Sequence, residues 1–160
     1  PALSVSLSGD QDPASIKRRA NFATVYVVKD ENADARIILP VHGYGLWSTM
    51  YGFMALEGDF STVVGFGFYQ QAETPGLGGE VDNPAWKALW EGKEVYNEQG
   101  DAVIALAKGA VDPNDPQASH KVDGLSGATL TSRGVTNLVQ YWLGEDGFGP
   151  FLAKLRSEGV

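Results

Sequence analysis

The sequence predicts an α+β fold, in which a mainly antiparallel, twisted sheet is flanked by helices. Apolar and β-branched runs occur in pairs that short polar or glycine-rich loops join, which is typical of hairpins. Apolar residues at helical spacing are concentrated towards the end of the chain. The 160 residues are 43% apolar, which is enough for one sizeable core, so we expect a single domain over residues 1–160.

Composition excludes several classes of function. A formal net charge of −8 argues against nucleic-acid binding and against anionic lipid surfaces. The absence of cysteine excludes disulfides, thiolate catalysis and cysteine-ligated clusters. No stretch approaches the ~20 apolar residues of a membrane span, and no signal peptide opens the chain. Because the chain starts at Pro1, we expect a processed domain or a fragment, with any membrane anchor upstream.

The first elements are predicted from short runs. Asp12-Pro13 can open a short helix that continues to Ala20. Residues 24–28 and 36–39 are β-branched or aliphatic strands on either side of a polar hairpin loop, and Pro40 is expected to end the second strand. A glycine-punctuated loop over residues 41–50 then carries Trp47 towards a strand that runs to about Leu56.

The middle of the chain continues the hairpins. Residues 57–59 form a turn, and residues 60–71 form a long strand with Gly65 and Gly67 on one face and Phe66 and Phe68 on the other. Glycines inside a strand favour a bulge or a close approach by another backbone or a ligand. A second glycine loop, residues 73–79, leads to Asn83 and Pro84, which specify the start of a helix with Trp86, Leu89 and Trp90 on one side.

Neither glycine-rich region is a dinucleotide site. The pairs Gly65/Gly67 and Gly76/Gly78 do not complete the G-x-G-x-x-G fingerprint, and neither pair lies in a strand–turn–helix unit. Downstream, residues 97–100 form another hairpin, residues 112–119 form a surface loop, and a closing helix begins near Pro150 with Leu152 and Leu155 facing inward.

The stretch from Asp123 to Ser132 is typical of an anion-binding turn. Val135, Leu138, Val139 and Trp142 form the apolar stripe of the helix that follows, with Thr131 or Ser132 expected as its N-cap and Gly144 after its last turn. Free N–H groups at a helix N-terminus stabilise phosphate, and small residues at positions 127 and 128 allow a close approach. An ordinary capped helix explains the same residues equally well.

The residue types do not indicate a self-sufficient enzyme. His42 and His120 have no carboxylate or hydroxyl neighbour in the sequence that would make either an evident base. The hydroxyls of Ser126, Thr129, Thr131 and Ser132 need an activating base to act as nucleophiles, and Asp123 is the only ionisable residue in the motif. We therefore assign no catalytic residue and no metal ligand.

The stretch Asp-Gly-Leu-Ser-Gly-Ala-Thr-Leu-Thr-Ser, residues 123–132, resembles the flavinylation motif of FMN-binding domains. In those domains a flavin transferase joins FMN to a threonine through a phosphoester bond. Four further blocks, residues 39–47, 73–78, 83–86 and 142–151, resemble the C subunits of the bacterial sodium-translocating NADH:quinone oxidoreductases. The resemblance runs from about residue 20 to the end of the chain.

The resemblance implies a covalent FMN on Thr129, with Ser126, Gly127, Ala128, Thr131 and Ser132 around its phosphate. It suggests Trp47, Thr74 and Leu77 as contacts of the flavin ring, with N–H groups from Gly76 to Gly78 beside it. Asp123 is expected to be recognised by the transferase. As a C subunit of this kind, the domain would relay electrons, would have no nicotinamide site of its own and would lie on the periplasmic side of the inner membrane.

The same resemblance implies partners, namely the other subunits of a membrane complex that oxidises NADH, reduces ubiquinone and exports sodium. Membrane association would come from a segment outside this chain. Two alternatives remain open. The motif alone also fits the flavin subunit of Rnf-type electron-transport complexes, and an unmodified domain would be a phosphate-ligand-binding or assembly module.

Overall fold

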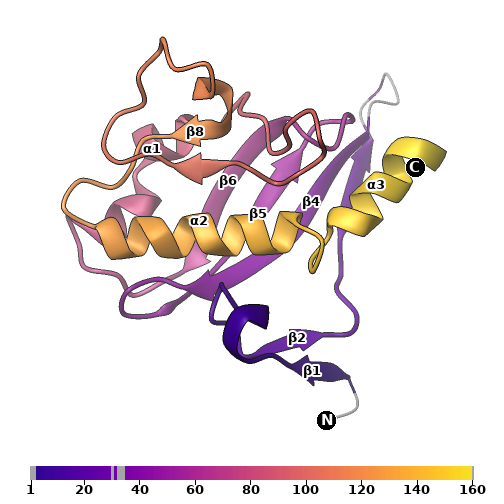
Figure 1. The fold of residues 1–160 in the computed structure, drawn as a ribbon, viewed down its shortest axis with the longest axis horizontal. Coiled ribbons are helices and arrows are strands. Elements are labelled where there is room, and N and C mark those ends of the chain that lie inside the picture. Colours follow the sequence, from indigo (N-terminus) through magenta and orange to yellow (C-terminus); the bar gives the residue numbers. More distant parts are fainter. Residues whose placement is uncertain (1–2, 30, 32–34, 160) are drawn as a thin grey trace.

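A computed structural model describes residues 3–29, 31 and 35–159, and it confirms the α+β fold (Figure 1). The main sheet has four strands in the order β3-β4-β5-β6, all antiparallel, and the long helix α2 lies across one of its faces. These strands are Tyr26–Lys29, Ala35–Tyr44, Thr49–Leu56 and Val63–Gln70.

Smaller elements surround this sheet. The strands β1 (Ser4–Ser6) and β2 (Arg18–Ala20) pair antiparallel, and β7 (Ala105–Leu106) and β8 (Lys121–Val122) pair parallel. The α-helices are α1 (Pro84–Ala88), α2 (Thr129–Leu143) and α3 (Gly149–Glu158), and the 3₁₀ turns are η1 (Gly9–Gln11), η2 (Gly78–Asp82) and η3 (Ala118–His120).

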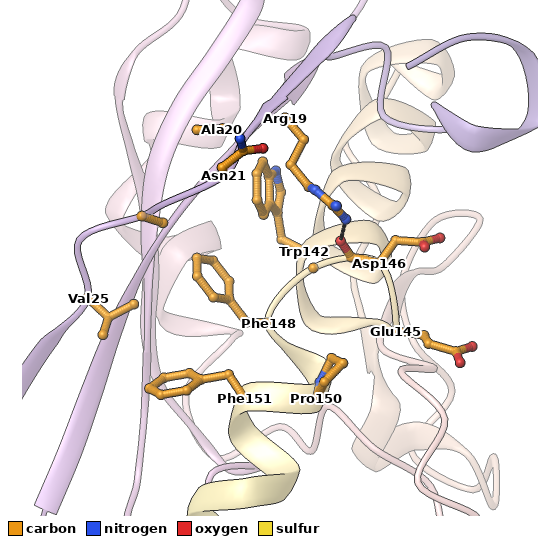
Figure 2. Close-up of a pocket in the computed structure, with 12 residues that line it drawn as sticks. Arg19, Ala20, Asn21, Val25, Trp142, Glu145, Asp146, Phe148, Pro150 and Phe151 are labelled. Atoms are coloured by element: carbon orange, nitrogen blue, oxygen red, sulfur yellow. Dashed lines mark hydrogen bonds between the residues drawn. The ribbon is translucent and has the colours of Figure 1, made fainter. Parts of the chain in front are cut away.

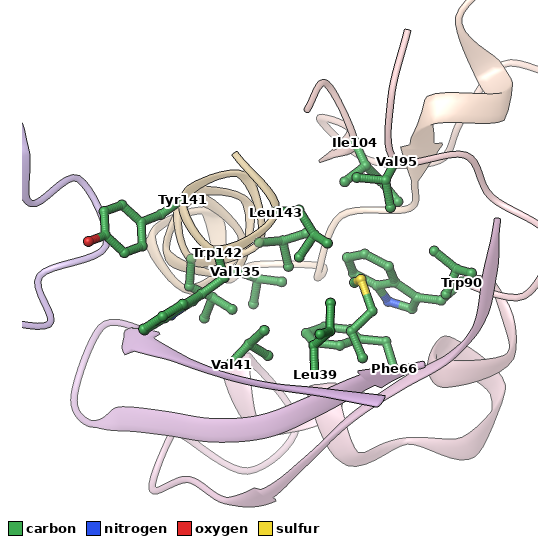
Figure 3. Packing of buried hydrophobic residues seen from close by; sticks show 14 of the residues in the cluster. Leu39, Val41, Phe66, Trp90, Val95, Ile104, Val135, Tyr141, Trp142 and Leu143 are labelled. Carbon is green, nitrogen blue, oxygen red and sulfur yellow. The ribbon is translucent and has the colours of Figure 1, made fainter. Parts of the chain in front are cut away.

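The core lies between the sheet and α2 (Figure 3). Alternate residues of β4, namely Ile37, Leu39 and Val41, are at most 2% exposed and point towards the helix. The stripe predicted for α2 is buried against them: Val135, Leu138 and Val139 are fully buried and Trp142 is 7% exposed. Period-two burial in the strand and helical-period burial in α2 therefore determine which face of each element is turned towards the other.

The sheet contains the predicted irregularity. Two register shifts interrupt the pairing of β5 with β6, one between Tyr51 and Gly52 and one between Ala55 and Leu56. A Cβ at Gly52 would lie 2.3 Å from the carbonyl oxygen of Gly67, so the two backbones approach closely there. Phe66 and Phe68 share one face of β6, as predicted, and both are buried. The bulges let the glycine-containing strands twist tightly against each other.

The predicted helix over residues 13–20 is wrong. The Asp12 carboxylate accepts hydrogen bonds from the N–H groups of Ile16 (2.8 Å) and Lys17 (2.7 Å), which offers the backbone an alternative to helix. Ser15 and Lys17 adopt left-handed φ angles of 52° and 63°. The chain consequently turns back, and β2 pairs with β1.

Two other boundaries differ from the predictions. Pro40 does not end its strand, because β3 pairs with β4 only up to Ile38 and no described strand requires an N–H from Pro40 on that edge. The strand consequently continues to Tyr44, and Gly43 belongs to it: a Cβ there would lie 2.5 Å from Leu138 Cβ on α2. Leu89 is 39% exposed because α1 ends at Ala88, whereas Trp86 and Trp90 are buried.

Other predicted connections are present. The turn at residues 57–59 joins β5 to β6, and the bridge between Tyr96 and Ala102 closes the predicted hairpin. Leu152 of α3 is fully buried, with Leu155 partly buried beside the core. The hairpin between β3 and β4 is confirmed by its register, although most of its predicted loop, residues 30 and 32–34, lies outside the described residues.

Candidate functional site

The site is built around the N-terminus of α2. The helix begins at Thr129, earlier than the predicted N-caps Thr131 and Ser132, and Ala128 occupies the N-cap position without a side-chain cap. The N–H groups of Thr129, Leu130 and Thr131 have no hydrogen-bond acceptor among the residues that the structure describes. These donors and the positive end of the helix dipole form a cradle for an anion.

The four hydroxyls of the motif divide into two pairs. Thr131 is 1% exposed and its hydroxyl donates to Glu73 Oε2 over 2.7 Å, while Ser132 is 9% exposed and its Oγ accepts from the N–H of Leu125 over 3.0 Å. Both therefore hold the turn together from inside and do not cap the helix. Ser126 and Thr129 are exposed, so their hydroxyls are the ones that a reacting partner can reach.

Gly127 brings the second glycine loop to the motif. Its φ of +68° is a left-handed conformation that favours glycine, and a Cβ at this position would lie 3.0 Å from Leu77 Cδ2. Ala128 is 6% exposed beneath this contact. Two loops that are far apart in the sequence therefore meet directly, as a shared cofactor site requires.

Glu73 joins these loops to a third one, although its place in the sequence indicates no such role. Its side chain accepts five hydrogen bonds: from the N–H groups of Leu46, Trp47 and Ser48, from the Ser48 hydroxyl and from the Thr131 hydroxyl, at 2.7–3.1 Å. The residue is 5% exposed. The β4–β5 loop and the first turn of α2 are thereby tied to one carboxylate.

Two glycines leave room for this carboxylate. A Cβ at Gly45 would lie 2.6 Å from Glu73 Oε1, and a Cβ at Gly78 would lie 2.5 Å from Thr131 Oγ1. Both distances are too short for a side chain to be added without displacing the hydrogen-bonded groups. Glycine at these positions of the two loops is therefore a packing requirement of the Glu73 cluster, in addition to the N–H that Gly78 was predicted to offer a cofactor.

Hydrogen bonding outweighs burial in setting the charge of Glu73. Burial alone raises the pKa of this carboxyl group. The Thr131 hydroxyl and the main-chain N–H groups of Trp47, Leu46 and Ser48 stabilise the ionised form, and their combined effect holds the pKa below its usual value. Glu73 is therefore a carboxylate at neutral pH.

The predicted ring contacts lie on the surface of this cluster. Trp47 is 65% exposed and Leu77 is 43% exposed, so Trp47 is not a core aromatic. Thr74 and Gly76 are also exposed, and Gly76 has a left-handed φ of 74°. The carbonyl oxygen of Thr74 accepts from the N–H groups of Leu77 and Gly79, which fixes this loop as a turn. An apolar surface suited to a planar ring thus lies close to the α2 N-terminus.

Asp123 has a structural contact in addition to its predicted recognition role. Its Oδ1 accepts from the N–H of Val111 over 2.8 Å, and its carbonyl oxygen accepts from Trp86 Nε1 over 2.9 Å. The residue consequently anchors the chain entering the motif to α1 and to the preceding loop. Its second carboxylate oxygen has no hydrogen-bond donor within the described part of the chain.

The histidines have structural surroundings. The His42 ring stacks on Tyr51 with 5.4 Å between ring centroids, and burial lowers its pKa. His120 Nδ1 lies 2.8 Å from the carbonyl oxygen of Glu94. Among the described residues, no group of three or more His, Asp and Glu side chains could hold a metal ion. Neither ring is among the residues that converge on the motif.

A separate groove lies away from the motif. A groove of about 520 Å³ runs between the segment after β2 and the turn from α2 to α3, where Arg19 donates to the carbonyl oxygen of Asp146 (Figure 2). Trp142 and Phe148 line it. This is the C-terminal end of α2, ~20 Å from Thr129 at 1.5 Å per residue. The motif is an open surface site and does not depend on this groove.

Comparison with known families defines the class of the site. The FMN-binding domain family matches residues 45–144, which include the Trp47 loop, Glu73, the Leu77 loop and the whole motif. The fold and its converging loops are those of an FMN-binding domain. The donors at the α2 N-terminus, the left-handed Gly127 and the exposed apolar side chains fit such a cofactor, with phosphate at the helix end and the ring on the loops.

Individual relatives give a narrower assignment. The C subunit of the Na(+)-translocating NADH-quinone reductase of Pseudomonas aeruginosa is 62% identical over 98% of this chain, and that of Vibrio vulnificus is 52% identical over its whole length. The crystal structure of NqrC from Shewanella oneidensis superposes with a TM-score of 0.90 at 40% identity, covering 99% of this chain and 71% of that one. The chain belongs to the family of the C subunits of Na(+)-translocating NADH-quinone reductases.

The relatives are longer than this chain. It spans 60% of the Pseudomonas aeruginosa protein and 62% of the Vibrio vulnificus protein. Among the described residues, no helix is both long enough and apolar enough to span a membrane.

Proposed function

We propose that Thr129 carries FMN through a phosphoester bond between its Oγ1 and the phosphorus of the cofactor. The observation that supports this most directly is the position of Thr129, an exposed hydroxyl on the first residue of α2 beside N–H groups that lack acceptors among the described residues. A phosphate on this oxygen would lie at the positive end of the helix. Ser126 has the other exposed hydroxyl but precedes the helix start.

The surrounding residues have distinct roles in this proposal. Gly127 and Ala128 let the phosphate approach the backbone, while Thr131 and Ser132 lock the turn through Glu73 and Leu125. Trp47, Thr74 and Leu77 form the surface for the flavin ring, with the main chain from Gly76 to Gly78 beside it. Of these three residues, Gly76 and Leu77 are exposed and Gly78 is buried. Asp123 is recognised by a flavin transferase that acts during maturation. FMN supplies reversible electron transfer when bound.

For the whole protein we propose electron relay in a respiratory membrane complex that oxidises NADH, reduces ubiquinone and exports sodium. The names of the C-subunit relatives support NADH oxidation, quinone reduction and sodium transport. The choice of ubiquinone comes from the resemblance alone. Residues 1–160 would act as one FMN-binding domain on the periplasmic side of the inner membrane, held there by a segment outside this chain and by contacts with other subunits. An exposed ring surface suits this role, because partner cofactors must come close to the flavin.

The proposal is tested by producing the protein with a flavin transferase and denaturing it. We expect a yellow band that fluoresces in a denaturing gel, and no band from Thr129→Ala. Colour that is lost on denaturation would mean non-covalent binding. A colourless parent would favour an unmodified phosphate-binding or assembly module.

A further inference from the structure

Glu73 is the most deeply buried ionisable group of the site, and the proposed function gives it no chemical task. It is 5% exposed, and both of its oxygens are occupied. Oε1 accepts from the N–H groups of Trp47 and Ser48 and from the Ser48 hydroxyl, while Oε2 accepts from Leu46 N–H and the Thr131 hydroxyl. A charge buried at this depth needs such donors to remain ionised.

We propose that Glu73 is the positioning residue that assembles the flavin site, because it holds the ring-contacting loops and the Thr129 turn in one fixed arrangement. This inference rests on the proposed function, since it assigns the arrangement to FMN. It assigns Glu73 no contact with the cofactor. Its effect passes through Trp47 on one side and Thr131 on the other.

Each link from Glu73 ends at a residue of the site. The N–H that Trp47 donates, over 3.0 Å, belongs to the residue whose exposed indole is the proposed ring contact. Thr131 lies two residues after Thr129, in the same first turn of α2. Glu73 itself precedes Thr74, whose carbonyl oxygen closes the turn that carries Leu77. One carboxylate therefore connects segments that are 26 and 58 residues away from it in the sequence.

Glutamate is specifically required by this geometry. Both oxygens accept at least one main-chain N–H, so the NH₂ group of a glutamine would face an N–H donor in either orientation. Aspartate is one methylene shorter and could not reach all of these donors. Glu73→Gln should therefore break the hydrogen bonds to one of the two side-chain oxygens while changing the volume of the side chain very little.

Asp59, an exposed carboxylate away from the site, provides a control. Its carboxylate also accepts from two main-chain N–H groups, those of Ser61 (2.9 Å) and Thr62 (2.8 Å), and from the Thr62 hydroxyl. It lies in the β5–β6 turn, at the far end of β5 from the Trp47 loop, about 25 Å away at strand rise. Asp59→Ala removes a comparable set of hydrogen bonds without touching the site.

The first measurement uses the flavin-free protein. Amide hydrogen exchange of Leu46, Trp47 and Ser48 is recorded by NMR in the parent, Glu73→Gln, Thr131→Val and Asp59→Ala. We expect exchange of these amides to speed up about tenfold or more in Glu73→Gln, and by a smaller factor in Thr131→Val, while Asp59→Ala leaves them unchanged. Unchanged exchange in Glu73→Gln would overturn the proposal whether or not the parent binds flavin.

The second measurement follows attachment by a flavin transferase, well below the melting temperature of every variant. We expect the initial rate of flavin attachment to fall by about 100-fold in Glu73→Gln, the order of loss that misplacement by about 1 Å causes, and to stay at the parental value in Asp59→Ala. Loaded Glu73→Gln should also show lower flavin fluorescence anisotropy.

The outcomes separate the two proposals. If Glu73→Gln has the attachment rate and anisotropy of the parent, Glu73 only stabilises the fold and the positioning proposal is wrong. The assignment of FMN to Thr129 would be unaffected. A parent that never carries flavin on Thr129 would overturn the proposed function, and the amide exchange of Leu46, Trp47 and Ser48 would still decide whether Glu73 positions the loops. An equal loss of attachment in Asp59→Ala would show that general destabilisation is the cause, which would also overturn the proposal.

Discussion

Adding one methyl group at Gly134 tests how closely α2 is seated on the sheet. Gly134 is buried in the second turn of the helix, and a Cβ there would lie 2.5 Å from the carbonyl oxygen of Tyr44 and 2.9 Å from Gly45 Cα. Both atoms belong to the main chain and cannot rotate away. The helix would have to move off the end of β4, and the Thr129 turn would move with it.

Two opposing effects determine the size of the change in Gly134→Ala. Alanine is favoured over glycine in a helix by about 1 kcal/mol, which on its own would stabilise the variant. Overpacking a well-packed contact costs about 1–3 kcal/mol, and a rigid backbone partner places this case at the upper end. We therefore expect a net loss of about 1–2 kcal/mol in the free energy of unfolding, equivalent to a fall of about 2–8 °C in melting temperature.

Urea unfolding followed by circular dichroism measures this difference, with Gly65→Ala as the control. A Cβ at Gly65 would have no atom within 4 Å, so that variant should unfold close to the parent. Gly134→Ala should also accept flavin more slowly, because the donors at the α2 N-terminus shift. A Gly134→Ala variant that is as stable as Gly65→Ala would refute the close seating of α2 on which the site geometry depends.

Three other substitutions test separate parts of the account. Trp47→Ala should brighten flavin fluorescence and shift the reduction potential at equal flavin loading. Its free energy of unfolding should change by no more than about 0.5 kcal/mol, because the indole is 65% exposed. Unchanged emission and potential would remove Trp47 from the ring site. Asp123→Asn should have the melting temperature of the parent, because the amide oxygen can still accept from the N–H of Val111. The variant should nevertheless remain colourless. Normal flavin loading would show that Asp123 only anchors the turn. Burial raises the pKa of Tyr96 to about 12. The folded state therefore keeps a proton that the unfolded state loses above about pH 10. The free energy of unfolding should consequently fall between about pH 10 and 12. Tyr96→Phe should cost about 1 kcal/mol at neutral pH by leaving Leu143 O without its donor. The fall in stability at alkaline pH should be smaller in this variant, with the remainder due to Tyr141, whose pKa burial also raises.

Local patterns predicted the parts of the fold that depend on local physics. The apolar stripe of α2 could be predicted because its residues recur at helical spacing. The hairpins could be predicted because their turns use polar and glycine residues. The N-terminal helix failed because the Asp12 side chain competes for the same N–H groups, an interaction that helix signals do not reveal. The predicted strand end at Pro40 was wrong because the effect of a proline depends on whether a neighbouring strand pairs at that point.

The sequence indicated which loops belong to the proposed site, but it did not indicate the residue that joins them. Trp47, Leu77 and Thr129 were selected from loop composition and resemblance, and the three loops that carry them do converge. Glu73 was not selected, because an acidic residue before a Thr-Pro-Gly turn normally faces solvent, and all of its donors outside its own loop are at least 25 residues away. Only tertiary structure shows that Thr131 points at this carboxylate and away from solvent.

The most direct test of the central claim is tryptic mass spectrometry of the protein produced with a flavin transferase. We expect the peptide containing Thr129 to gain the mass of one FMN less one water, and fragmentation to place that mass on Thr129. The same mass on Ser126 would contradict the assignment, since Ser126 is the other exposed hydroxyl of the motif. Its placement on the buried Thr131 would contradict the structural account of the site as well.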